Sequence, residues 1–181
     1  LRVAGALWAL DPALAHQRQF PAVDWETSYS LHAERTDPWF GEHAGPEWPA
    51  LRRDTLELLQ RERELKEIAG LIGPDALQDR DRLLLEAARL VRETVLGQSA
   101  FDLNDALSPV EKTYRLALLA LAAYRAGLGA LDGGALFDQL NIAAVRRALA
   151  AIRWSAPADL AVRAAEAELA IQHLAPSGAH P

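Results

Sequence analysis

Side chains that could carry catalysis are few and scattered in this sequence. The chain contains no cysteine, which excludes thiolate nucleophiles, disulfides and cysteine zinc sites. It also lacks the motifs GxxxxGK[ST], GxGxxG, HExxH and GxSxG. The histidines show no i, i+4 pair that a helix could present to a metal ion; they are His16, His32, His43, His173 and His180. We therefore expect neither a catalytic residue nor a metal site.

Two pairs of opposite charge stand at helical spacing. Glu57 precedes Arg61 by four residues, and Glu62 precedes Lys66 by the same interval. Such pairs meet on one face of a helix, where they most often line a solvated surface. We expect both pairs to be exposed.

Composition bounds the class of protein. The 181 residues are 50% hydrophobic and 24% charged, which is typical of a globular domain. A net charge of −6 argues against broad nucleic-acid binding. No apolar run approaches the roughly 20 residues that span a bilayer, and the first dozen residues do not resemble a signal peptide. Because methionine is absent even at position 1, we expect a processed chain or a piece of a longer one.

The elements that would position any site change character along the chain. Residues 1–10 are apolar at nearly every position and stop at Asp11, as a buried strand of a parallel sheet would. Asp11 caps a short helix that begins with Pro12. Residues 20–50 are rich in proline and tryptophan and predict an irregular linker, whose aromatic residues pack onto neighbouring elements: Trp39, Phe40 and Trp48.

The remainder of the chain has helical periodicity. Apolar stripes predict helices from Pro49 to Gly73 and over residues 79–96. Ser108-Pro109-Val110-Glu111 reads as a capping box that opens a third helix, ending near Gly127 and Gly129. Shorter helices are predicted over residues 134–140, 142–153 and 157–174. The fold class is mainly α, an antiparallel helical bundle preceded by a strand and a linker.

Three stretches resemble one family. FPAVDWETSYS (Phe20–Ser30), which follows WALDPALAHQRQ, is similar to the linker signature of the catalytic A subunit of V-type and archaeal-type rotary ATPases. ELLQRERELKEIAGLIGPDAL (Glu57–Leu77) and LVRETVLGQSAFDLNDAL (Leu90–Leu107) resemble two later segments of the same subunit, in the same order. The chain therefore resembles the C-terminal portion of that subunit.

The resemblance implies a division at about residue 35. Residues 1–35 would be the end of a RecA-like nucleotide-binding domain, and residues 36–181 the C-terminal helical domain. The parent subunit binds ATP or ADP with Mg²⁺, but its phosphate loop, its Mg²⁺-binding acid and its water-positioning glutamate lie upstream of the matching region. Since phosphoryl transfer depends on such groups, the chain by itself is expected to be inactive and to hold no nucleotide tightly.

The resemblance also places part of an adenine pocket in this chain. By motif position, Phe20 and Phe101 correspond to two aromatic residues that sandwich the base in the related F-type β subunit, and Ala100 would lie beside the ring. A flat π-face binds a base without paired donors. Without the resemblance, both phenylalanines would be read as core residues.

A second implied site is mechanical. Gly73–Asp81 stands where the F-type β subunit has its rotor-contacting DELSEED loop. Gln78 and Arg80 break the acidic run, so the topology carries this comparison more than the charge does. The alternative is that this segment is an ordinary connection between two helices, without a rotor contact. The expected rotor contacts are Asp75, Ala76, Leu77, Gln78, Asp79, Arg80 and Asp81.

The implied setting is a membrane-associated rotary complex. Its A subunits alternate with B subunits in a hexamer around a central rotor stalk, peripheral to the cytoplasmic face of the membrane, and couple ATP hydrolysis or synthesis to ion transport. Neither nucleic acid nor direct membrane insertion is expected. Two alternatives stay open: a non-catalytic helical interaction module, and the family's non-catalytic B subunit.

Overall fold

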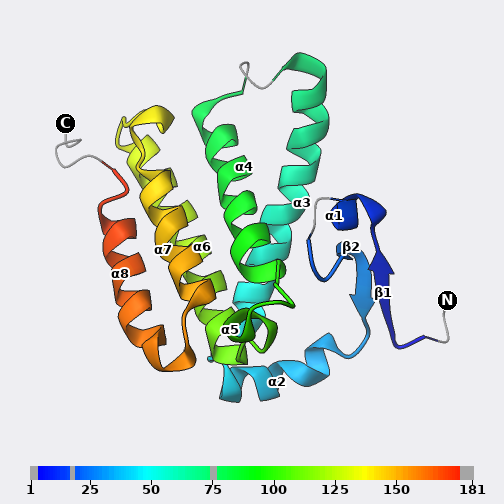
Figure 1. Ribbon diagram of the computed structural model, residues 1–181. Coiled ribbons are helices and arrows are strands. Elements are labelled where there is room, and N and C mark those ends of the chain that lie inside the picture. The colour runs from blue at the N-terminus through cyan, green and yellow to red at the C-terminus, as the bar shows by residue number, and fades with distance from the viewer. Residues whose placement is uncertain (1–3, 17–18, 74–76, 176–181) are drawn as a thin grey trace.

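The computed structural model describes residues 4–16, 19–73 and 77–175. Its main body is a set of long helices that run alternately up and down (Figure 1): α3 (Trp48–Ile72), α4 (Asp79–Val91), α6 (Val110–Asp132), α7 (Ile142–Trp154) and α8 (Leu160–Gln172). Shorter elements are β1 (Ala6–Leu10), α1 (Pro12–His16), β2 (Val23–Ser30), α2 (Ala33–His43) and α5 (Leu103–Ala106). The predicted mainly α, antiparallel bundle is confirmed.

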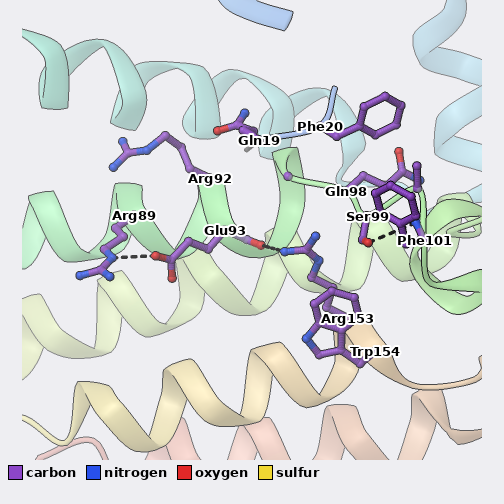
Figure 2. Close-up of a pocket in the computed structure, with 12 residues that line it drawn as sticks. Gln19, Phe20, Arg89, Arg92, Glu93, Gln98, Ser99, Phe101, Arg153 and Trp154 are labelled. Carbon is purple, nitrogen blue, oxygen red and sulfur yellow. Dashed lines mark hydrogen bonds and ion pairs between the residues drawn. The ribbon is translucent and has the colours of Figure 1, made fainter. Parts of the chain in front are cut away.

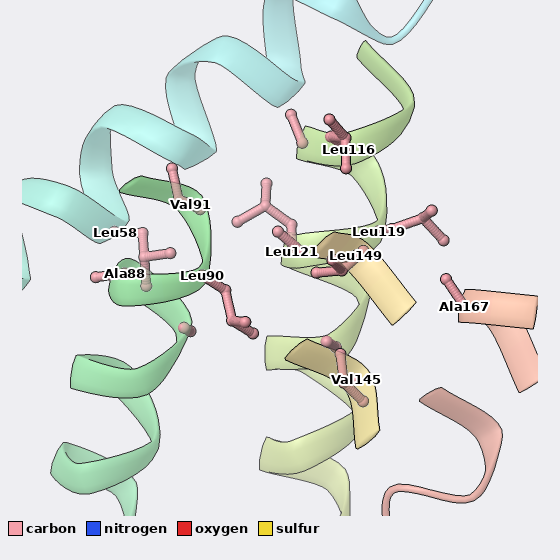
Figure 3. Close-up of a cluster of buried hydrophobic side chains, with 14 of the residues drawn as sticks. Leu58, Ala88, Leu90, Val91, Leu116, Leu119, Leu121, Val145, Leu149 and Ala167 are labelled. Carbon is pink, nitrogen blue, oxygen red and sulfur yellow. The ribbon is translucent and has the colours of Figure 1, made fainter. Parts of the chain in front are cut away.

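The core lies between α3, α4, α6 and α7 (Figure 3). Leu59, Val91 and Leu149 are fully enclosed, one from each of three helices. The predicted α3 stripe is buried through Leu65, but Ile68 is half exposed because the last turns of α3 extend past the neighbouring helices. Helical periodicity therefore identified the inward face except at this projecting end.

The N-terminal region differs from its prediction. Instead of a buried parallel strand followed by a linker, β1 and β2 form an antiparallel pair in which Ala6 faces Ser30 and Leu10 faces Val23. The segment VDWETSYS is rich in β-branched and aromatic residues, which suit a half-buried pleated surface. Trp8 on β1 is exposed, so the apolar run does not mark burial on both faces.

The rest of the predicted linker is helical. α2 occupies residues 33–43, and the Phe40 ring stacks on Trp48 at the start of α3, with ring centroids 4.5 Å apart. Trp48 in turn packs against the core. Phe40 and Trp48 thus join α2 to the bundle as expected, although from helices rather than from irregular chain, whereas Trp39 is half exposed and stacks on His43 within α2.

Gly127 and Gly129 do not end α6, which continues to Asp132. A Cβ at position 127 would lie 2.8 Å from both methyl carbons of Leu83 on α4, so this glycine allows α4 and α6 to pack closely. The predicted capping box is also absent, because Pro109 is the N-cap and no side chain caps the helix. Residues 137–139 form only a 3₁₀ turn in place of the predicted helix over 134–140.

Candidate functional site

A pocket of about 730 Å³ lies where the lower end of α4 meets the segment before β2 and the end of α7. Its walls, drawn in Figure 2, come from three stretches of the chain that are distant in sequence: residues 19–20, 89–101 and 153–154. The lining residues are Gln19, Phe20, Arg89, Arg92, Glu93, Gly97, Gln98, Ser99, Ala100, Phe101, Arg153 and Trp154.

The structure brings Phe20, Ala100 and Phe101 to this pocket. The two residues are 55% and 103% exposed, so neither belongs to the core of this chain, against the alternative interpretation. A backbone hydrogen bond joins the two segments: the Gln98 N–H donates to the carbonyl of Phe20. Two exposed π-faces on one pocket can bind a flat heteroaromatic group.

A π-helical turn leads from α4 into the pocket. Residues 92–96 follow α4 directly, and the Gly97 N–H donates to the Arg92 carbonyl over 2.8 Å. The predicted helix over 79–96 therefore has the right limits but changes type in its last turn. Single π turns within helices are found frequently at functional sites.

The loop after this turn is held by its own polar groups. The Asp102 side chain caps α5 by accepting from the backbone N–H groups of Asn104 and Asp105, at 2.9 and 3.1 Å. The Gln98 amide donates to the carbonyl of Asp105 over 2.6 Å. These contacts fix the two ends of the segment that carries Phe101.

Lys112 on α6 also holds this loop, and sequence reasoning missed it. Its side chain is enclosed, with 1% of the residue exposed, and Nζ donates to the carbonyls of Asn104 and Ser155 at 2.8 and 3.1 Å. Burial lowers the pKa of Lys112, while the carboxylates of Asp105 and Asp102 partly offset that shift. The sequence signal that could have indicated this role is the position of a lysine within the apolar stretch of α6.

The cations around the pocket all have partners. Arg89 Nε donates to Glu93 over 2.7 Å, a contact that raises the pKa of Arg89. Arg92 pairs with Glu62, which also meets Lys66 Nζ at 2.9 Å. Glu62 is buried, so the expectation of a solvated Glu62–Lys66 pair is wrong: this carboxylate faces Arg92 across the α3–α4 contact instead of water.

The second predicted site is the α3–α4 connection at the opposite end of α4. Asp75 and Ala76 lie outside the described residues. Leu77 is buried, whereas Gln78 and Arg80 are exposed and Asp81 is half-buried. The segment therefore presents polar side chains outward and anchors itself through an apolar one.

Polar contacts attach the start of α4 to the α6–α7 connection. Asp79 Oδ2 accepts from the Phe137 N–H over 2.9 Å, and Arg80 pairs with Asp132. Arg82 pairs with Asp138 at 2.6 Å and lies over the Phe137 ring. Sequence spacing gave no indication of these contacts, since they join segments more than fifty residues apart.

The described part of the chain contains neither a metal-binding cluster nor a helix that could cross a membrane. Within residues 4–16, 19–73 and 77–175, no cluster of three or more histidine and acidic side chains could hold a metal ion. Over the same ranges, no helix combines the length and apolar character needed to cross a membrane.

Fold and pocket together define a helical bundle domain that carries an open, aromatic-lined pocket at one end. Residues 37–139 match the family model described as the C-terminal domain of V and A type ATP synthase. The chain belongs to this family, and it corresponds to the C-terminal portion of the A (alpha) subunit.

Individual relatives agree with this assignment. The V-type ATP synthase alpha chain of Anaeromyxobacter dehalogenans is 48% identical over 134 residues, 74% of this chain and 23% of the relative. That of Thermoanaerobacter pseudethanolicus is 40% identical over 162 residues, 90% of this chain and 28% of the relative. The A subunit of the A-type ATP synthase of Pyrococcus abyssi is 40% identical over 154 residues, 85% and 15% respectively.

This chain thus spans less than a third of each of these relatives. The three relatives are named as alpha chains or A subunits, which agrees with the interpretation as an A subunit and not with the alternative of a B subunit.

Proposed function

We propose that this chain supplies the adenine side of the nucleotide site in the catalytic subunit of a V/A-type ATP synthase. The observation that carries the proposal is the pair of exposed rings, Phe20 and Phe101, on one pocket. An apolar side chain that is left exposed beside a cavity has a face to offer a ligand. The base of ATP or ADP would stack on these rings, with Ala100 leaving room beside them.

The chemistry would come from elsewhere in the parent subunit. The sequence contains no phosphate-binding loop, and phosphoryl transfer needs positioned groups around the phosphates and Mg²⁺. The chain alone would therefore hydrolyse no ATP. The parent complex, with B subunits and a central stalk at the cytoplasmic face of a membrane, would couple ATP hydrolysis or synthesis to ion transport.

The α3–α4 connection would contact the rotor. The ends of α3 and α4 that it joins lie at the end of the bundle opposite the pocket (Figure 1), and these two helices pack against each other. We call the α3–α4 connection, the first turn of α4 and its partner Asp132 the tip. Closure of the subunit on nucleotide would then move the tip as part of a rigid helical pair. The site comprises the segment from Asp75 to Asp81.

Substitution of Phe101 tests the adenine site. In the full-length subunit, Phe101→Ala should weaken binding of MgADP by about 1–3 kcal/mol, roughly five- to a hundred-fold, through lost stacking. Leu103→Ala is a matched control, because Leu103 is an exposed apolar residue at the start of α5, two positions after Phe101, that does not line the pocket. Titration calorimetry measures both. Unchanged affinity in Phe101→Ala would show that Phe101 does not contact the base.

Deletion of the tip tests the rotor contact. Removing the connection and one turn of each flanking helix should lower torque in single-molecule rotation of the reconstituted complex, while MgADP affinity is retained. Neutralising Asp75, Asp79 and Asp81 together should leave most rotation intact, because a surface ion pair contributes only about 0–1 kcal/mol. Undiminished torque after the deletion would make this segment an ordinary connection.

A further inference from the structure

Arg153, at the end of α7, reaches into the loop that carries Phe101. Its Nε and Nη2 atoms both donate to Asp105 Oδ2, at 2.9 and 2.7 Å. Its remaining Nη1 donates to the backbone carbonyl of Glu93 over 2.6 Å, the contact drawn as a dashed line in Figure 2. One guanidinium therefore joins α7 to the π-helical turn and to the loop at the same time.

The contact continues from Asp105 to Phe101. The same Oδ2 that accepts from Arg153 also accepts from the Ser99 N–H over 2.5 Å. Ser99 Oγ in turn accepts from the Phe101 N–H at 3.3 Å. A short chain of hydrogen bonds thus runs from Arg153 through Asp105 and Ser99 to the backbone of Phe101.

Because Asp105 is buried, its carboxylate depends on its hydrogen-bonding partners. The Asp105 side chain is almost enclosed, and a buried carboxylate is stable only when charged or hydrogen-bonding partners compensate its desolvation. Arg153 supplies that compensation. Its guanidinium carbon also lies over the Trp154 ring, 4.5 Å from the ring centroid. The loop conformation that presents Phe101 to the pocket therefore depends on a cation from α7.

Arg153 lies outside residues 37–139, the part of the chain that matches the family model. The following inference rests on the proposed adenine site. We propose that Arg153 is a positioning residue for nucleotide binding: through Asp105 and Ser99, it holds Phe101 against the base. Its side-chain donors are engaged by Asp105 and by the Glu93 carbonyl, so we expect its effect to pass through Phe101.

A double-mutant cycle in the full-length subunit tests this inference, with MgADP affinity as the readout. Arg153→Ala alone should weaken binding by at least about 3-fold and by no more than Phe101→Ala, whose loss is roughly 5- to 100-fold. In the Phe101→Ala background, Arg153→Ala should add little, because the group it positions is already gone. Arg153→Lys should recover part of the affinity.

Arg163→Ala is the matched control. Arg163 pairs with Glu166 on the surface of α8, away from the pocket, and its removal should leave affinity unchanged. Circular dichroism and thermal unfolding show whether each variant is folded. Should Arg153→Ala prove unfolded, Arg153→Lys in the wild-type and Phe101→Ala backgrounds gives the same cycle with a smaller effect.

The outcomes separate the two proposals. Unchanged affinity in Phe101→Ala overturns the adenine site itself. A normal loss in Phe101→Ala with none in folded Arg153→Ala overturns only the positioning role. Equal losses from the Arg153 substitution in both backgrounds also overturn it, because they would show a general structural effect independent of Phe101.

Discussion

The two ends of α4 use the same charged groups in opposite surroundings. At the pocket end, the side chains of Arg153 and Asp105 are 17% and 5% exposed. At the tip, those of Arg80 and Asp132 are 56% and 57% exposed. The first pair joins α5 to the end of α7, and the second joins the start of α4 to the end of α6.

The difference in burial implies different mechanical properties. Breaking a buried pair leaves an uncompensated charge, whereas water replaces the partner of an exposed ion almost without loss. The pocket loop is therefore fixed in one arrangement, and the charged contacts at the tip can exchange. A firmly held binding end and an adjustable contact end suit a domain that would meet a ligand at one end and a moving partner at the other.

The largest effect is expected from Asp105→Ala at the pocket end. The substitution leaves Arg153 partly buried without its carboxylate and removes the acceptor of the Ser99 N–H. We expect a loss of about 3–5 kcal/mol in the free energy of unfolding, measured by urea denaturation. Asp132→Ala at the tip is the control, with a loss below about 1 kcal/mol. Equal losses would remove the contrast between the two ends.

An intermediate effect is expected from Lys112→Met. This substitution keeps the apolar stem but leaves the carbonyls of Asn104 and Ser155 without their donor. The loss should be about 1–3 kcal/mol near neutral pH, by the same denaturation measurement. A loss within error of zero would indicate that solvent or a backbone shift satisfies both carbonyls.

The pH dependence of that loss has a definite sign. Burial lowers the pKa of Lys112 below its ordinary value of 10.5, so between the two values the unfolded chain binds more protons than the folded chain. Wild-type stability should therefore rise with pH relative to Lys112→Met across this alkaline window. Tyr114, whose pKa burial raises, acts in the opposite direction but is common to both proteins. A difference that falls with rising pH would contradict the assignment.

The smallest effect is expected from Arg80→Ala at the tip. Loss of the exposed pair with Asp132 should cost less than about 1 kcal/mol in unfolding free energy. High salt should reduce the difference between variant and wild type further, because ions screen exposed charges. A cost comparable to that of Asp105→Ala, or one insensitive to salt, would show that the tip is as firmly fixed as the pocket end.

Local patterns anticipated much of the bundle. Periodic leucines identified α3 and α4, and Gly73 and Gly97 mark where those helical segments stop. The resemblance brought Phe20 and Phe101 forward as a pair, and both line one pocket. Such features depend on neighbours three or four residues apart or on short motifs, which a sequence displays directly.

Features that depend on distant partners were not anticipated. The proline- and tryptophan-rich surroundings of β2 predict a linker and obscure this eight-residue strand. Gly127 predicts a helix end, although it serves close packing against Leu83. The spacing of Glu62 predicts a surface residue, although α3 presents it to Arg92.

By itself the sequence determined where the long helices lie, which of their faces are apolar and which family the chain resembles, because these follow from local spacing and motif identity. Only the tertiary structure decided that Lys112, Asp105 and Arg153 meet beneath the Phe101 loop. A charged residue has the same local signature whether water or another helix surrounds it. Its burial, and with it the energy of its contacts, is set by helix packing between segments that the sequence keeps far apart.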